Sequence, residues 1–185
     1  MIPRTALVRV ACALWLATLP PPSGALAQAA ASSAAPPTET DPAYHQLDFW
    51  LGDWEVTAGA GHVRDGHDLV EKVLKGAAIV EHWSDADGSE GRSWFYYHRA
   101  EKRWKQVWVT DSGFIKEKAL IASFPDGGVR FRGEVALRDG SKVLDQTTLT
   151  PLPGGTVHQV IETSKDGGKS WVVGYDAIYT HGARP

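Results

Sequence analysis

Cysteine is nearly absent from this sequence, because Cys12 is the one cysteine in 185 residues. Cys12 lies in an N-terminal segment, residues 1–27, in which two arginines precede an apolar run that stops at Pro20 and a small-x-small triplet ends at Ala27. We interpret this segment as an export signal peptide, which predicts a periplasmic or secreted protein. Cleavage after Ala27 would leave a chain with no disulfide, no thiolate nucleophile and no cysteine metal ligand.

Long apolar runs and basic tracts are missing as well. A transmembrane helix needs about 20 apolar residues, and the three prolines from Pro20 interrupt the first run, so we expect no membrane span in the mature chain. Removal of residues 1–27 takes Arg4 and Arg9 away, so Lys+Arg falls from 19 to 17 while Asp+Glu stays at 22 and the net charge becomes −5. This acidic balance argues against nucleic acid or an anionic membrane as a partner.

The motifs of common catalytic and cofactor sites are absent too. The sequence has no Gly-x-Ser-x-Gly elbow, no P-loop and no dinucleotide fingerprint. Its seven histidines show no HxH or HExxH spacing, so we predict no metal site and no bound cofactor. An enzyme is therefore less expected than a binding protein, and no catalytic residue is assigned.

Turn signals dominate what is present. After an Ala/Ser/Pro-rich segment, residues 28–43, that is typical of a flexible leader, Gly- and Asp-rich turns recur every eight to twelve residues. The segments between them alternate in polarity, most clearly over 129–138, where apolar and charged residues take turns. We predict a helical turn within 42–51 and ten strands, at 53–58, 67–75, 78–84, 92–99, 103–110, 114–123, 128–138, 142–150, 156–164 and 170–179.

Such short connections force antiparallel neighbours. Ten sequential strands then predict an all-β domain over residues 44–181, an antiparallel up-and-down barrel that closes on itself. We expect a monomer or a weak homo-oligomer.

The stretch FWLGDWEV, residues 49–56, opens this domain. Its Gly52-Asp53-Trp54 resembles the Gly-x-Trp signature of the first lipocalin strand, where glycine permits close approach of the crossing chain and the indole closes the barrel end. We expect Trp54 to be this plug, with Phe49 and Trp50 packed on the closed end. The resemblance implies a basic residue late in the chain on Trp54, and the last predicted strand offers none before Arg184.

A longer series of stretches carries a second resemblance. LDFWLGDWEV, IVEHWS, GRSWFYYHRAEKRWKQVWVTDSG, TLTP and HQVIETSKDGGKSWVVGYDAIY occur in this order over residues 47–179. They resemble a family of exported bacterial proteins of unknown function with a calycin-like barrel of the lipocalin or nitrobindin type. The resemblance implies a barrel and export, and it brings no established ligand or reaction.

Alternation also predicts which side chains line the barrel. On four strands the more apolar face carries Ile79, Glu81 and Trp83; Trp104, Gln106 and Trp108; Leu144, Gln146 and Thr148; Val157, Gln159 and Ile161. An apolar pocket with a few convergent polar groups is typical of a small-molecule site. We predict that a small, largely apolar molecule binds to Glu81, Trp83, Tyr97, Trp104, Gln106, Trp108, Gln146 and Gln159. The alternative is that these polar groups only satisfy one another inside a filled barrel.

Two other functions stay open at this point. Calycin barrels also host hydratase- and isomerase-type reactions, and a buried Glu81 without a cationic partner would have a raised pKa and could act as an acid or base beside Tyr97. A salt bridge from Glu81 to an arginine at the barrel mouth is the simpler alternative. Nitrobindins hold haem through one histidine, for which His158 is the candidate, although alternation places it on the outer face.

Overall fold

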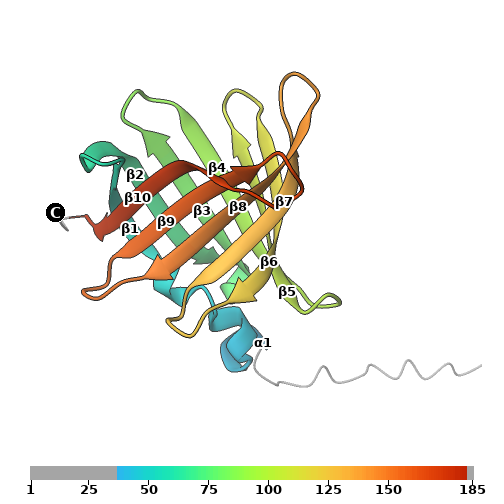
Figure 1. The fold of residues 1–185 in the computed structure, drawn as a ribbon. Coiled ribbons are helices and arrows are strands. Elements are labelled where there is room, and N and C mark those ends of the chain that lie inside the picture. The colour runs from blue at the N-terminus through green and yellow to red at the C-terminus, as the bar shows by residue number, and fades with distance from the viewer. Residues whose placement is uncertain (1–36, 183–185) are drawn as a thin grey trace, which may run out of the picture. The chain divides into compact units, whose positions relative to one another are not determined.

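The fold is a closed β-barrel. The computed structural model describes residues 37–182, so the proposed signal peptide, residues 1–27, and the first part of the leader, 28–36, lie outside the described residues. Each strand pairs antiparallel with its neighbours in sequence, and the last strand pairs with the first (Figure 1). The predicted all-β, ten-stranded, up-and-down, calycin-like barrel is therefore confirmed.

All ten predicted strands are present, with ends within a few residues of those expected. They are β1 (Gly52–Ala58), β2 (Val63–Val73), β3 (Ala78–Asp85), β4 (Glu90–His98), β5 (Arg103–Thr110), β6 (Ile115–Ser123), β7 (Val129–Ala136), β8 (Lys142–Pro151), β9 (Val157–Ser164) and β10 (Val172–His181). The short helices are α1 (Pro37–Thr40), η1 (Pro42–His45), η2 (Asp48–Trp50) and η3 (Leu74–Gly76). Regular structure thus begins at Pro37, inside the segment predicted to be a flexible leader.

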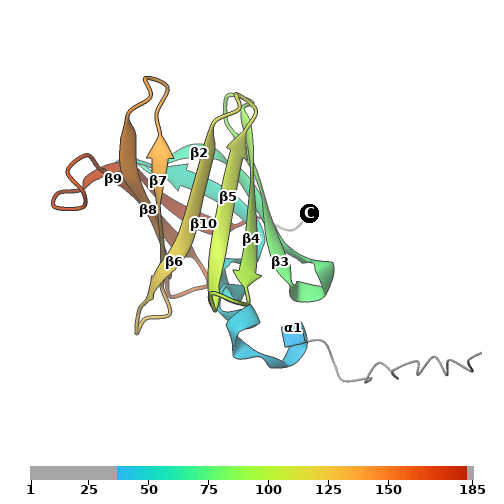
Figure 2. The same cartoon turned by 90° about the vertical axis from the view of Figure 1, so that its right-hand side faces the viewer.

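The N-terminal helical turns close one end of the barrel (Figures 1 and 2). Tyr44, Leu47 and Trp50 from these turns are buried. The Trp104 indole donates from Nε1 to the Ala43 carbonyl oxygen over 2.7 Å, which ties the segment to β5. An apolar segment that is anchored through its backbone therefore fills the opening that ten strands leave at this end.

Trp54 is part of this plug, as predicted. Its ring is buried, stacks on Trp50 with centroids 6.1 Å apart, and donates from Nε1 to the Trp50 carbonyl oxygen. As the sequence indicates, β10 contains no lysine or arginine to pack on Trp54. The His181 ring takes this place, because it stacks on the indole with centroids 4.2 Å apart. The pairing of Trp54 with His181 across β1 and β10 brings the two rings together.

Packing divides the barrel interior into two parts. Beside the plug, large apolar side chains fill the interior; they include Ile79, Phe95, Trp104, Phe131 and Leu149. Toward the opposite end, where the β3–β4 and β5–β6 turns lie, the inward side chains become polar and leave a cavity. Within residues 37–182, none of the helices has the length and apolar character needed to cross a membrane.

Candidate functional site

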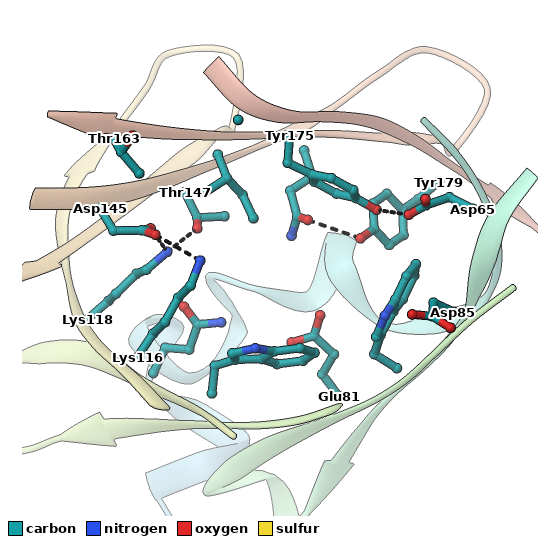
Figure 3. A pocket seen from close by; sticks show the side chains of 16 residues that line it. Asp65, Glu81, Asp85, Lys116, Lys118, Asp145, Thr147, Thr163, Tyr175 and Tyr179 are labelled. Atoms are coloured by element: carbon teal, nitrogen blue, oxygen red, sulfur yellow. Dashed lines mark hydrogen bonds and ion pairs between the residues drawn. The ribbon is translucent and has the colours of Figure 1, made fainter. Parts of the chain in front are cut away.

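The cavity has a volume of about 430 Å³ and occupies the half of the barrel away from the plug. Strands β2, β3, β5, β6, β8, β9 and β10 all contribute side chains to its wall (Figure 3). Its size lies in the range of pockets that hold small organic molecules. The alternative of a solidly filled barrel therefore does not describe this half of the interior.

Five of the eight predicted site residues line this cavity: Glu81, Trp83, Gln106, Trp108 and Gln159. Two others, Tyr97 and Trp104, belong to the packed half, where their rings lie 6.0 Å apart and both contact Tyr44. They close the barrel below the cavity instead of lining it. Period-two alternation selects the correct face on β3, β5 and β9, but it does not say how far along the barrel the interior is filled.

Gln146 is not in the cavity. It lies on the outer face of β8, where its Oε1 accepts from Arg132 Nε and Nη2 and its Nε2 donates to Glu162 Oε2 over 2.7 Å. The inward face of this strand carries Val143, Asp145, Thr147 and Leu149, so the face predicted to point inward, with Leu144 and Thr148, points outward. Gln146 is buried because it lies within a polar cluster on the outer surface of the sheet.

Two indoles form the apolar walls, and each lies over a glycine. A Cβ on Gly91 would lie 2.2 Å from the Trp108 ring, and a Cβ on Gly66 would lie 2.7 Å from the Trp83 ring. Real Cβ atoms do not approach other atoms this closely. The missing side chains on β4 and β2 therefore give the indoles the space to lie flat along the cavity wall.

A pair of carboxyl groups lies at one side of the interior. Asp68 on β2 is fully buried and Glu81 on β3 nearly so, and both Asp68 carboxyl oxygens lack a hydrogen-bond partner among the described residues. Burial raises the pKa of Asp68 well above its ordinary range, and the facing Glu81 carboxylate raises it further. Burial also raises the pKa of Glu81, whereas the neighbouring Ser93 hydroxyl and Asp68 carboxyl lower it. Both carboxyl groups are therefore easier to protonate than ordinary surface carboxyl groups.

Glu81 lines the cavity and has one buried oxygen without a partner in the described part of the chain. Its Oε2 has no hydrogen-bond partner among the described residues, and neither has the nearby Gln106 Oε1, whose amide donates instead to Ser93 Oγ over 3.0 Å. No arginine forms a salt bridge with Glu81 in the described part of the chain. Within the described residues, Glu81 is therefore buried without a salt-bridge partner, and its pKa is raised, as the sequence predicts for such a carboxyl group. Buried polar atoms without partners are uncommon and call for a specific explanation.

The opposite wall carries charges that the sequence patterns did not reveal. Lys118 from β6 donates from Nζ to Thr147 Oγ1 over 2.5 Å and forms a salt bridge with Asp145 on β8. Lys116 Nζ forms a second salt bridge with Asp145, at 2.8 Å. Burial lowers the pKa of Lys118 to about 8, although the Asp145 charge opposes this shift.

Two tyrosines from β10 complete the cavity. Tyr175 donates its hydroxyl to Asp65 Oδ2 over 2.6 Å, and Tyr179 donates to Gln159 Oε1 over 3.1 Å. Burial raises the pKa of both hydroxyl groups, so they remain protonated donors near neutral pH. Tyr179 also contacts Trp50 edge-on, with centroids 4.7 Å apart, so it marks the floor of the cavity above the plug.

His158, the candidate haem ligand, lies on the outer face of β9. Its Nε2 lies 2.7 Å from Asp176 Oδ1, and it does not contribute to the cavity wall. No group of three or more His, Cys, Asp or Glu side chains arranged to hold a metal ion occurs among residues 37–182. The cavity's own polar groups are carboxyls, amines, amides and phenols.

Comparison with known proteins adds no relative. No protein-family model matches the chain, and a search of curated proteins finds no match. The function must therefore be inferred from the cavity itself.

Proposed function

We propose that this protein is an exported, lipocalin-like barrel that binds a small, largely apolar molecule in its interior, and that it belongs to the exported bacterial family that its motifs resemble. The observation that carries the proposal is the cavity of about 430 Å³ between Trp83 and Trp108 in a barrel whose other half is packed solid. Natural interiors are filled to crystal-like density, so a cavity of this size is a costly feature unless a ligand occupies it.

The wall combines surfaces suited to an aromatic or alicyclic body with a few fixed polar groups. Trp83, Trp108 and Ile161 supply apolar area. Glu81 and Gln106 line the cavity and supply polar groups, and each has one buried oxygen without a partner among the described residues. Their positions are fixed by neighbouring hydrogen bonds, so they would orient a ligand rather than adapt to many.

A matched pair of variants tests whether the cavity is the binding site. Ile161→Trp places an indole in the cavity, whereas Val160→Trp places one on the outer face of the same strand. We expect quenching of Trp fluorescence by 1-naphthol and by 2-naphthoate in the wild type and in Val160→Trp, and its loss in Ile161→Trp. Native mass spectrometry gives the stoichiometry. Equal binding to both variants, or no binding of any probe to the wild type, would refute the proposal.

The carboxyl pair supports a second candidate function, a hydratase- or isomerase-like reaction. Glu81 lines the cavity beside the buried Asp68, and burial raises the pKa of both carboxyl groups, so Glu81 could take a proton from a bound molecule and return it. The substitution Glu81→Gln separates the two functions. A binding protein keeps most of its affinity, whereas an acid–base catalyst loses turnover and keeps binding.

A further inference from the structure

Two ammonium groups share one carboxylate inside the barrel (Figure 3). The Lys118 and Asp145 side chains are 2% and 3% exposed, and that of Lys116 is 19% exposed. In the described part of the chain neither lysine forms a salt bridge with a second acidic side chain. With both lysines protonated, the group carries an excess of one positive charge.

An uncompensated charge in such a place is costly. Buried charged side chains are normally paired, because an unpaired one loses its hydration without compensation. The lowered pKa of Lys118 reflects this loss. Of the six N–H groups on the two amines, one from Lys116 and two from Lys118 are taken up by Asp145 and Thr147. Three donors remain beside the cavity.

Strand β6 is inverted to place these amines inside. Lys116, Lys118 and Leu120 point into the barrel, whereas Ile115 and Ile121 point outward and are 52% and 46% exposed. A one-residue shift of the strand would bury the two isoleucines and Glu117 and would expose the two lysines and Leu120. It would bury more apolar area and replace two buried ammonium groups by one carboxylate. Departures from local rules of this kind are expected at functional sites.

The other wall has the opposite character. Glu81, Asp65 and Asp85 face the cavity from the β2–β3 side, where Asp65 accepts from Tyr175 and Asp85 accepts backbone N–H groups of the β3–β4 turn. A negatively charged ligand group would be repelled at that wall and attracted at the wall formed by β6 and β8. The cavity therefore favours one orientation of an anionic ligand.

We infer that the ligand is a small organic carboxylate, whose anionic group binds Lys116 and Lys118 while its apolar body lies against Trp83 and Trp108. This inference rests on the proposed function, because it names the class of molecule that the cavity would bind. The carboxylate would neutralise the excess charge and use the remaining ammonium donors, and charge-assisted hydrogen bonds of this kind are among the strong ones.

The experiment compares isosteres. Dissociation constants are measured at pH 7 for 2-naphthoate and for 2-naphthamide, which has nearly the same shape and no charge. We expect the wild type to bind the carboxylate at least tenfold more tightly than the amide. Lys118→Met and Lys116→Met should each remove most of this preference while leaving affinity for the amide within about threefold. Lys105→Met, which removes an outer-face lysine paired with Glu101, should change neither.

The outcomes are distinguishable. If the amide binds as tightly as the carboxylate or more tightly, this inference is overturned. The proposed small-molecule site then still stands, provided that Ile161→Trp abolishes binding of the amide. Absence of binding by both probes refutes the proposed function as well. If Lys118→Met does not fold, the comparison of the two probes in the wild type and in Lys116→Met still decides the question.

Proton uptake gives an independent readout at pH 8. The groups that face Lys118 are Lys116, Asp145 and Thr147 on its own side and Glu81 across the cavity. A bound carboxylate raises the pKa of Lys118 from about 8, so calorimetry in buffers of different ionisation enthalpy should show uptake of up to about half a proton. Naphthamide should cause no uptake. Zero uptake with tightly bound naphthoate would contradict the assigned role of Lys118.

Discussion

The Trp108 ring occupies the space that a side chain at position 91 would need. A Cβ on Gly91 would lie 2.2 Å from two of the ring carbons. Gly91 on β4 pairs with Thr110 on β5, two positions along the strand from Trp108, so Gly91 and Trp108 are diagonal neighbours on one face. The space inside the barrel between β4 and β5 is thus filled by the Trp108 indole of β5, because Gly91 of β4 has no side chain. The shape of the cavity depends on this arrangement.

The first prediction concerns this contact. Gly91→Ala should force the indole or the strand to move and should lower the free energy of unfolding by about 1–3 kcal/mol, the usual cost of overpacking. Gly61→Ala is the control, because its Cβ would meet only Val63 Cγ2 at 3.5 Å, an ordinary contact. Urea denaturation measures both. Equal effects of the two substitutions would show that the Trp108 ring can move aside at no cost.

The second prediction concerns the carboxyl pair. The pKa values of Asp68 and Glu81 are raised on folding, so their contribution to stability is fully present below the unfolded-state values near 4 and is lost as the pH rises through the folded-state values. Asp68→Asn removes the titration and should make the protein more stable than the wild type at pH 8, by about 1–3 kcal/mol. The difference should shrink at pH 5. Urea denaturation at the two pH values provides the test, and a variant that is less stable at both would contradict it.

The third prediction concerns Lys118. Its pKa falls from 10.5 in the unfolded chain to about 8 in the folded one, so the charged amine opposes folding below pH 8 and this opposition is relieved as the pH rises through 8 to 10.5. The free energy of unfolding of the wild type should therefore rise between pH 7 and 9.5 relative to that of Lys118→Met. Staying below pH 9.5 avoids ionisation of tyrosines in the unfolded chain. Parallel curves for the two proteins would mean that Lys118 titrates normally.

The fourth prediction concerns the plug. His181→Ala removes the ring that stacks on Trp54 and should lower the free energy of unfolding by about 0.5–1.5 kcal/mol, with a change in Trp emission. His158→Ala is the control, because it breaks only a partly exposed pair with Asp176, which contributes at most about 1 kcal/mol. A larger loss for His158→Ala would show that the stacked pair is not the stronger contact.

The fifth prediction separates the plug from the segment before it. A chain that begins at Asp41 keeps the buried Tyr44 and Leu47 and the Ala43 carbonyl that Trp104 binds, whereas a chain that begins at Asp48 loses all three. We expect the first chain to melt close to the full protein and the second to lose at least 3 kcal/mol, as for removal of large buried side chains. Thermal melts followed by circular dichroism decide between them. Similar melting of both chains would mean that the strands alone hold the closed end.

The sequence was sufficient to predict the strands because turn residues mark their boundaries. It was sufficient to predict the plug because Gly52-Asp53-Trp54 stands at the start of the first strand, where a glycine lets the chain approach closely and an indole can close the barrel end. It was insufficient on β8, where both faces carry polar residues and alternation alone does not say which one is inside. The parity of Val143 and Leu149 with Asp145 was the available signal. Asp145 is stable inside because lysines from β6 reach it, and such a long-range compensation leaves no local pattern.

Lys116 and Lys118 were missed for the same reason. A strand that begins Ile-Lys-Glu-Lys predicts lysines in water. That expectation fails here because Asp145 on β8 provides a buried partner for both lysines. Asp68 was overlooked because a single aspartate in a strand otherwise resembles a surface residue. The register of β2 against β3, which pairs Asp68 with Trp83 and is not marked in the sequence, places Asp68 on the same face as Glu81.

Closure of the barrel also sets how the chain must fold. The seam between β1 and β10 joins residues such as Glu55 and Thr180, which are 125 positions apart, and the stacking of His181 on Trp54 completes it. Contacts this distant in sequence form late, so folding should be slow for a domain of this size, on the order of milliseconds to seconds. Until β10 pairs with β1, the edge of β1 stays open. The indoles beside that edge are the surface on which misassembly would begin.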